Sequence, residues 1–217
     1  MADLFTDASY HAPARRVSLA EGAVLLGGFA RPDERALLDA VAAVAAAAPL
    51  RHMVTPGGYR MSVAMTNCGA AGWITDRAGY RYEMIDPDSG RTWPAMPQAF
   101  TDLARRAAAA AGFDDFAADA CLINRYEPGA KLSLHQDRNE RDRSAPIVSV
   151  SLGLGVVFLF GGPRRSQRPQ RIPLAHGDVV VWGGPARMAF HGVLPLADGE
   201  HPLVGRARIN LTFRRAL

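Results

Sequence analysis

Arg206-Ala-Arg-Ile-Asn-Leu-Thr-Phe-Arg214 is the clearest strand in the sequence and the segment that decides the fold. Polar residues at every second position alternate with apolar ones, and a strand points alternate side chains to opposite faces. In an ordinary surface strand the polar face would contact solvent. If the polar face instead lines the mouth of a barrel, the apolar face packs against helices, which predicts helices flanking a two-sheet barrel.

Short strand-like segments, separated by turn residues, fill the rest of the C-terminal half. They cover residues 121–126, 131–137, 147–152, 156–160 and 178–182. Upstream, residues 53–69 and 73–93 mix aromatic residues with Gly, Asp and Pro, which favours short strands and loops over helix. The sequence therefore predicts a β-rich C-terminal half.

Two helices are predicted in the N-terminal half. The first begins at residues 32–34, Pro-Asp-Glu, and runs through Leu, Ala and Val residues to Pro49. The second begins near Pro97 and ends at Gly112. Its buried face is predicted by apolar residues at positions i, i+3, i+4 and i+7, namely Phe100, Leu103, Ala104 and Ala107.

The bulk composition fits one globular domain, with 217 residues of which 48% are hydrophobic and 21% charged. The net charge of +4 suits a negatively charged partner but does not by itself identify nucleic acid. Cys68 and Cys121 form no C-x-x-C pair, so we expect reduced, buried thiols, with a single disulfide as the alternative. Residues 1–7 lack the pattern of a secretory signal, and no apolar run reaches the ~18 residues that span a bilayer. We expect a cytoplasmic enzyme without membrane association.

His135 and Asp137 stand two residues apart, and positions i and i+2 of a strand share one face, so both can bind one ion. His191, which precedes Gly192, is the best third ligand among the other histidines. Each is weak evidence alone, because H-x-D tripeptides are common and single histidines are usually packed or exposed. Two imidazoles and one carboxylate suit Fe(II) but also permit Mn, Co, Ni or Zn.

The argument for iron comes from the last predicted strand. Arg208 and Arg214 lie on one face of it, about 20 Å apart along the backbone, and their long side chains can converge on a short dicarboxylate. Guanidinium groups bind carboxylates in a bidentate manner, and Asn210 between them adds amide contacts. A dicarboxylate beside the metal is what a non-haem iron oxygenase requires. Without the metal ligands, the same residues would indicate a solvated basic strand end.

Several motifs together resemble the bacterial AlkB demethylases. The quoted runs are Met53-Val-Thr-Pro-Gly-Gly-Tyr59, Met61-Ser-Val-Ala-Met-Thr-Asn-Cys-Gly69, Trp93-Pro-Ala-Met-Pro97, Cys121-Leu-Ile-Asn-Arg-Tyr126, Leu132-Ser-Leu-His-Gln-Asp137, Ile147-Val-Ser-Val-Ser-Leu-Gly-Leu154, His176-Gly-Asp-Val-Val-Val-Trp-Gly-Gly184 and Asn210-Leu-Thr-Phe-Arg214. The resemblance covers nearly the whole chain beyond the first twenty residues.

This resemblance implies an α+β fold with a double-stranded β-helix (jelly-roll) core, flanking helices and an N-terminal nucleotide-recognition lid. We expect a single catalytic domain over residues 1–217, with an N-terminal extension at 1–20, helices and lid at 21–118 and the jelly-roll core at 119–217. The implied activity is that of an Fe(II)- and 2-oxoglutarate-dependent dioxygenase. It would use O2 to demethylate N-alkylated bases such as 1-methyladenine and 3-methylcytosine, with release of succinate, CO2 and formaldehyde.

The resemblance also implies individual roles. The family's iron ligands are matched by His135, Asp137 and His191. Its 2-oxoglutarate contacts are matched by Asn124, Tyr126, Arg208, Asn210 and Arg214. We expect Arg208 to hold the distal carboxylate and Arg214 the end nearer the metal.

On the substrate side, Trp73 and Tyr80 match the family's base-stacking and backbone-contacting aromatic residues. Hydrophobic packing is the alternative for both, and it is the interpretation that we favour for Trp93 and Trp182. Arg165 matches a residue of the family that contacts the substrate. The alternative is that Arg165 is a solvated residue of a basic loop without a role in binding. That loop contains Arg164, Arg165, Arg168 and Arg171.

Asn139 departs from the family pattern, because bacterial AlkB has a second aspartate here that touches the damaged base. A carboxylate would attract cationic lesions such as 1-methyladenine, whereas asparagine keeps an acceptor but has no charge. The sequence predicts altered lesion preference or weaker binding of cationic bases, unless Glu140 substitutes for the missing carboxylate.

We expect single-stranded DNA as the substrate, because an unpaired base is easier to extrude, with RNA, including tRNA, and double-stranded DNA as alternatives. An enzyme that prefers etheno adducts is a further alternative. A metal-dependent hydrolase and a non-catalytic nucleic-acid-binding protein are rival classes, but neither explains the paired arginines. A monomer is the default oligomeric state.

Overall fold

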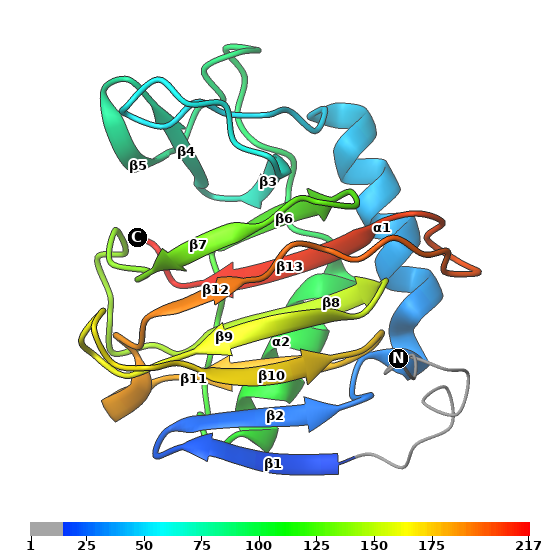
Figure 1. Cartoon of the computed structure of the whole chain (residues 1–217). Coiled ribbons are helices and arrows are strands. Elements are labelled where there is room, and N and C mark those ends of the chain that lie inside the picture. The colour runs from blue at the N-terminus through cyan, green and yellow to red at the C-terminus, as the bar shows by residue number, and fades with distance from the viewer. Residues whose placement is uncertain (1–14) are drawn as a thin grey trace.

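The structure is a computed structural model, and it describes residues 15–217. Two antiparallel sheets face each other and form a double-stranded β-helix, as expected (Figure 1). The large sheet has the order β1 (Arg15–Ala20), β2 (Ala23–Gly27), β11 (Val179–Trp182), β8 (Ile147–Gly153), β13 (Arg208–Arg214), β6 (Ala120–Tyr126) and β3 (Ala64–Gly69). The small sheet has the order β10 (Gln170–Leu174), β9 (Val156–Phe160), β12 (His191–Val193) and β7 (Leu132–His135).

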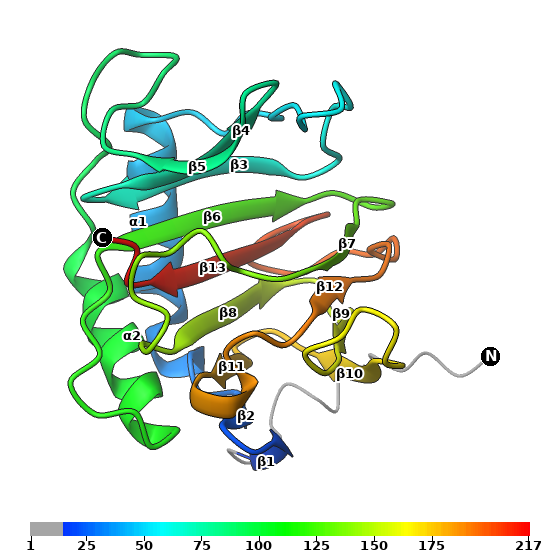
Figure 2. The same cartoon turned by 90° about the vertical axis from the view of Figure 1, so that its left-hand side faces the viewer.

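Two helices cover the outer face of the large sheet (Figures 1 and 2). They are α1 (Glu34–Ala47), preceded by the short helix η2 (Arg31–Asp33), and α2 (Gln98–Ala110), and both predicted helices are thereby confirmed. Prolines open both segments, where the fixed φ of proline suits a first turn and its missing N–H removes no helical bond. Phe100 of α2 packs edge-on against Phe213 of β13, with ring centroids 5.7 Å apart.

Strand β13 separates two regions of the core. Ile209, Leu211 and Phe213 belong to the apolar cluster beneath the helices. The second apolar cluster fills the space between the two sheets. Arg208 and Arg214 are also buried, which means that the polar face of the strand looks into the sandwich rather than into solvent. The predicted alternation is confirmed, and the barrel-lining interpretation of the polar face is the correct one.

The N-terminal segment adds strands to the large sheet. β1 and β2 form a hairpin, and β2 pairs with β11, with Val24 opposite Val181. β3 pairs with β6 at the opposite edge. The sheet therefore begins well before residue 119, where we expected the core to start. Four of the five residues of β2 are buried and lack a period-two pattern, so alternation could not reveal this strand. Residues 1–14, including the segment without a secretory pattern, lie outside the described residues.

A separate hairpin, β4 (Gly72–Asp76) and β5 (Gly79–Glu83), stands above the edge of the large sheet near β3 (Figure 2). We call this hairpin the lid. The expected short strands and loops between residues 53 and 93 are thus confirmed. Cys68 and Cys121 lie opposite each other on β3 and β6, and both are buried, free thiols. Neither helix within residues 15–217 is long and apolar enough to cross a membrane.

Candidate metal centre and cosubstrate pocket

The small sheet brings two predicted metal ligands together. His191 of β12 is the register partner of His135 of β7, and their ring centroids are 4.4 Å apart. A Cβ on Gly192 would lie only 2.8 Å from the Leu132 carbonyl oxygen, so this position needs glycine if β12 is to approach β7 this closely.

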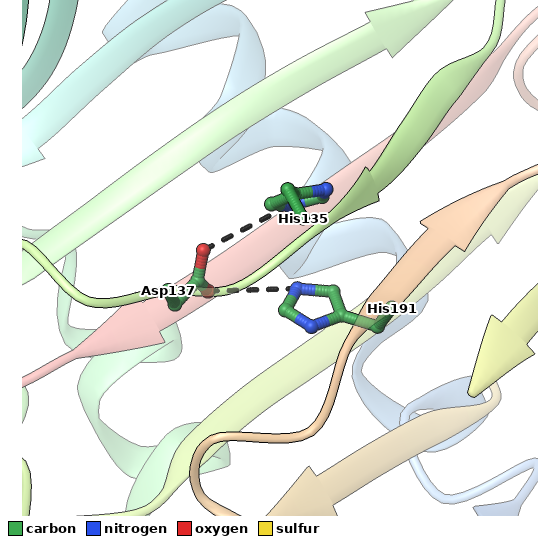
Figure 3. Close-up of side chains that lie close together, drawn as sticks. All are labelled: His135, Asp137 and His191. Carbon is green, nitrogen blue, oxygen red and sulfur yellow. Dashed lines mark ion pairs between the residues drawn. The ribbon is translucent and has the colours of Figure 1, made fainter. Parts of the chain in front are cut away.

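Asp137 completes the group, although it does not lie on a strand as we expected. β7 ends at His135, and the loop beyond it turns Asp137 toward both imidazoles (Figure 3). The carboxylate lies 3.8 Å from Nε2 of His135 through Oδ1 and 3.8 Å from Nε2 of His191 through Oδ2. One potential ligand atom from each residue lies within 4.8 Å of the others, which is close enough for all three to bind one ion.

Hydrogen bonds fix the orientation of both imidazoles. Nδ1 of His135 lies 2.8 Å from the Ser133 carbonyl oxygen, and Nδ1 of His191 lies 3.0 Å from that of Ala189. A carbonyl only accepts, so Nδ1 carries the proton in both rings and Nε2 keeps its lone pair. The Nε2 atoms face Asp137. In this tautomer Nε2 is available to bind a metal. The hydrogen bond from Nδ1 to a backbone carbonyl fixes the orientation of the ring.

The protonation states also suit a metal. Burial, together with the neighbouring His135, lowers the pKa of His191 to about 4. Burial would raise the pKa of Asp137, but Arg214 and the two imidazoles outweigh it and hold that pKa well below its usual range. Arg214 donates to Oδ2 of Asp137 from Nη2 at 2.6 Å and from Nε at 2.9 Å. Neutral imidazoles and an ionised carboxylate are the forms that bind metal ions.

A pocket of about 860 Å³ opens beside this centre, between the two sheets and beneath the lid. All twelve residues expected to form the site line it, and these are Trp73, Tyr80, Asn124, Tyr126, His135, Asp137, Asn139, Arg165, His191, Arg208, Asn210 and Arg214. The candidate metal ligands and the two arginines of β13 therefore face one shared space.

Arg208 lies in this pocket as a buried cation, with a relative exposure of 1%. Its guanidinium group lies 4.9 Å from the Tyr126 ring centroid, and its Nη2 donates to Ser151 Oγ at 2.8 Å. Burial lowers its pKa, and its Nε and Nη1 have no hydrogen-bond partner. No carboxylate within residues 15–217 forms an ion pair with it. A buried charge without a counter-ion costs several kcal/mol, so the pocket suits an anionic ligand at this end.

Asn210 lines the pocket, and its amide is also engaged within the protein. Its Nδ2 donates to Ser149 Oγ and to the Val150 carbonyl, while its Oδ1 accepts from Asn124 and Thr212. Asn210 therefore orients Asn124, whose Oδ1 remains buried without a hydrogen-bond partner. This unpaired atom and the two unpaired Arg208 nitrogens mark where a polar ligand fits.

The residues expected to contact the substrate lie at the mouth of the pocket. Trp73 and Tyr80 stack on the lid, with ring centroids 5.7 Å apart and an interplanar angle of 21°. Asn67 holds Trp73 through two hydrogen bonds to its backbone. Across the opening, Arg165 donates to the Leu134 carbonyl at 2.8 Å and lies over the ring of Phe190.

Two residues near the metal group have contacts that the sequence did not indicate. Trp182, which we interpreted as packing alone, also lines the pocket, and its ring centroid lies 4.9 Å from that of His191. Its place on a strand with buried Val180 could have indicated this, since both share one face. Glu140 cannot substitute for a carboxylate at position 139, because its side chain is buried between Tyr82 and Arg187 and does not line the pocket.

Comparisons with known proteins agree with this geometry. The model of the 2OG-Fe(II) oxygenase superfamily matches residues 22–214. The chain is 58% identical over 217 residues to the alpha-ketoglutarate-dependent dioxygenase AlkB of Salmonella typhimurium, covering 100% of this chain and 98% of that protein. This chain belongs to the AlkB family. The AlkB of Escherichia coli is 57% identical with the same coverage.

The fold of the AlkB family extends to a more distant solved structure. OsALKBH1 superimposes with a TM-score of 0.81 at 27% identity, covering 93% of this chain and 100% of that one. As a 2OG-Fe(II) oxygenase of the AlkB family, the protein uses Fe(II), 2-oxoglutarate and O2. The two imidazoles and the carboxylate fit the metal, and the buried guanidinium of Arg208, with two nitrogens that lack a hydrogen-bond partner, fits the dicarboxylate.

Proposed function

We propose that this protein removes alkyl groups oxidatively from N-alkylated nucleobases, such as 1-methyladenine and 3-methylcytosine. The observation that carries the proposal is Arg208, a buried cation without a protein carboxylate partner among the described residues, in the same pocket as the His-Asp-His group. A metal ion and a dicarboxylate could therefore bind next to each other in this pocket. A metal-dependent hydrolase would have no use for the buried cation.

In this proposal His135, Asp137 and His191 hold Fe(II). Arg208 binds the distal carboxylate of 2-oxoglutarate, and Arg214, which already lies against Asp137, holds the end nearer the metal. Bound iron would supply the oxidation chemistry, in which O2 converts 2-oxoglutarate to succinate and CO2 and adds its other oxygen atom to a C–H bond of the N-methyl group. The N-hydroxymethyl product then loses formaldehyde, which restores the base. The protein's own residues position the reactants and exclude water.

The lid residues would hold the base and the strand. Trp73 and Tyr80 provide aromatic surface for an extruded base, and Arg165 provides charge for phosphate on the other side of the mouth. Single-stranded DNA is the proposed substrate, because an unpaired base leaves its stack at lower cost. RNA, including tRNA, is the second candidate. We further propose a cytoplasmic monomer.

Asn139 would modify the choice of lesion. It donates from Nδ2 to the Tyr80 carbonyl at 3.2 Å, so its amide is tied to the lid backbone while its side chain lines the pocket. No carboxylate replaces it, since Glu140 faces away from the pocket. We therefore expect a weaker preference for cationic lesions than an aspartate at this position would give.

One assay tests the proposal. Protein purified without oxygen is loaded with Fe(II) and incubated with 2-oxoglutarate, O2 and a single-stranded oligonucleotide containing 1-methyladenine. We expect formaldehyde and succinate in near-equal amounts and restoration of adenine. An unmethylated oligonucleotide of the same sequence is the control and should give no formaldehyde. Absence of both products with iron demonstrably bound contradicts the proposal.

A further inference from the structure

Glu140 is a buried carboxylate that belongs to neither the metal group nor the pocket wall. Its relative exposure is 5%, and three segments that are distant in sequence place polar side chains around it. These are Tyr82 on the lid strand β5, Arg187 after the short helix η3 (Gly184–Ala186), and Arg214 on β13. A carboxylate buried at such a junction must be fully paired to be tolerated.

On the lid side, the Tyr82 hydroxyl donates to Oε1 of Glu140 at 2.7 Å. Tyr82 is the register partner of Trp73 in the β4–β5 hairpin, so the two side chains share one face of the lid. Displacement of the hairpin by a base that contacts Trp73 would therefore move the hydroxyl that binds Glu140.

On the metal side, two guanidinium groups connect Glu140 to Asp137. Arg187 donates from Nη2 to Oε2 of Glu140 at 3.0 Å and from Nη1 to the Asp137 carbonyl at 2.8 Å. Arg214 lies 3.5 Å from Oε1 of Glu140 and donates to the Asp137 carboxylate. Both the backbone and the side chain of Asp137 are thereby held by groups that Glu140 positions.

The charges of this cluster balance. Two carboxylates, Asp137 and Glu140, face two guanidinium groups, Arg187 and Arg214, and the four side chains are at most 10% exposed. Neutralising Glu140 would leave a buried positive excess beside Asp137, and this excess disfavours a bound cation.

We propose that Glu140 is a positioning residue that couples the lid to the metal centre through Tyr82, Arg187 and Arg214. Seating of a base on the lid then sets the alignment of Asp137 and Arg214, so that oxidation of 2-oxoglutarate is matched to oxidation of the base. This inference rests on the proposed function, since coupling is defined only for an enzyme that demethylates.

Tyr82→Phe tests the link on the lid side, because it removes only the hydroxyl. We expect the ratio of formaldehyde to succinate with a 1-methyladenine oligonucleotide to fall at least about threefold. Succinate formation without oligonucleotide should keep its wild-type rate. The ratio does not depend on the fraction of folded enzyme, so a purely structural role of the hydroxyl would leave it unchanged.

Glu140→Gln tests the centre of the network, with Glu127→Gln as the matched control, since Glu127 is an exposed carboxylate paired with Arg125. We expect a lower product ratio and weaker Fe(II) binding for Glu140→Gln, read anaerobically from the visible absorption of the Fe(II)–2-oxoglutarate complex. The control should match wild type. Wild-type ratios in both Tyr82→Phe and Glu140→Gln would overturn the coupling. A wild-type enzyme that forms no formaldehyde would instead overturn the proposed function.

Discussion

Arg208 shows at the scale of one residue how the fold prepares a site. Its charge is buried by strand pairing that also fixes its neighbours, because Arg208 lies opposite Tyr126 on one side and Gly153 on the other. The cost of that burial is offset when a carboxylate binds. The two Arg208 nitrogens without partners can therefore donate hydrogen bonds to a bound carboxylate, and this gain would add to the affinity for the ligand.

We predict that Arg208→Lys raises the KM for 2-oxoglutarate by about 10- to 100-fold, because lysine keeps the charge but loses the planar fork that pairs with a carboxylate. Steady-state succinate formation measures the effect. Arg206→Lys is the matched control, since Arg206 lies two residues before Arg208 and is an exposed side chain paired with Asp198. An equal rise in both variants would contradict a specific role for Arg208.

A second residue-scale prediction concerns Asn139→Asp. An aspartate cannot donate to the Tyr80 carbonyl, so its side chain should turn from the lid backbone toward the pocket and add a negative charge there. We expect the ratio of kcat/KM for 1-methyladenine to that for a neutral etheno adduct to rise several-fold. The two oligonucleotides are compared in parallel with both enzymes. An unchanged ratio would show that position 139 does not sense the charge of the lesion.

The sequence predicted the chemistry of single residues better than their connections. The metal group could be proposed because the H-x-D pair occurs together with a later histidine and with two arginines on the last strand, although each signal is weak alone. All twelve expected residues line one pocket. The contacts of Asn210 and Glu140 could not be predicted. The contacts of Asn210 depend on which strands pair with β13, and those of Glu140 depend on which segments meet around it. Local spacing in the sequence carries no information about either.

At the scale of elements, two buried histidines join the start of α1 to the loops behind the large sheet. His176 accepts the Gly153 N–H at Nδ1 and lies 2.9 Å from Glu34 through Nε2. Its ring stacks on His201 with centroids 4.4 Å apart. Burial lowers the pKa of both, that of His201 to about 4. The folded protein therefore holds both imidazoles neutral.

We predict that stability falls with acidity in this region. Unfolded histidine takes up a proton near pH 6.5, whereas folded His201 resists protonation until about pH 4, so the unfolded state binds more protons between these values. Between about pH 7 and pH 5, the free energy of unfolding should fall by about 2 kcal/mol on account of His201. Urea titrations of wild type and His201→Gln measure it. Equal losses in both proteins would exclude the stacked pair as the cause.

Strand prediction succeeded for β13 and failed for β2. β13 could be recognised from its alternating residues, whereas β2 reads as a continuous apolar run that fits either a strand or a buried helix. β10 was missed for another reason. It contains Pro173 in a sheet-edge position, and proline argues against a strand when only the sequence is known.

At the scale of the whole molecule, ligand binding and folding should be linked, because the residues proposed to hold the metal and the cosubstrate come from both sheets. We predict that anaerobic addition of Fe(II) and 2-oxoglutarate, each at about 100 times its Kd, stabilises the fold by about 5 kcal/mol, because each ligand contributes about 2.7 kcal/mol. That corresponds to a rise in Tm of roughly 10–20 °C for a protein of this size. Differential scanning fluorimetry measures the shift.

Chelation of the metal should reverse this rise, and Asp137→Ala should show little of it. The variant removes one proposed ligand, so a full shift in Asp137→Ala would indicate that the ions stabilise the protein from another place. The same titration with 2-oxoglutarate alone separates the contribution of Arg208 from that of the metal group.

The position of β13 between β6 and β8 has a consequence for synthesis on the ribosome. Both neighbours precede β13 in the chain, so a gap one strand wide must stay open until residues 208–214 emerge. A nascent chain at that stage already contains His135, Asp137 and His191 but neither arginine of the cosubstrate pocket. Because the chain is made from its N-terminus, the proposed reaction centre is complete only when β13 has been added to the sheet. Iron bound before that stage would have no cosubstrate beside it with which to activate oxygen.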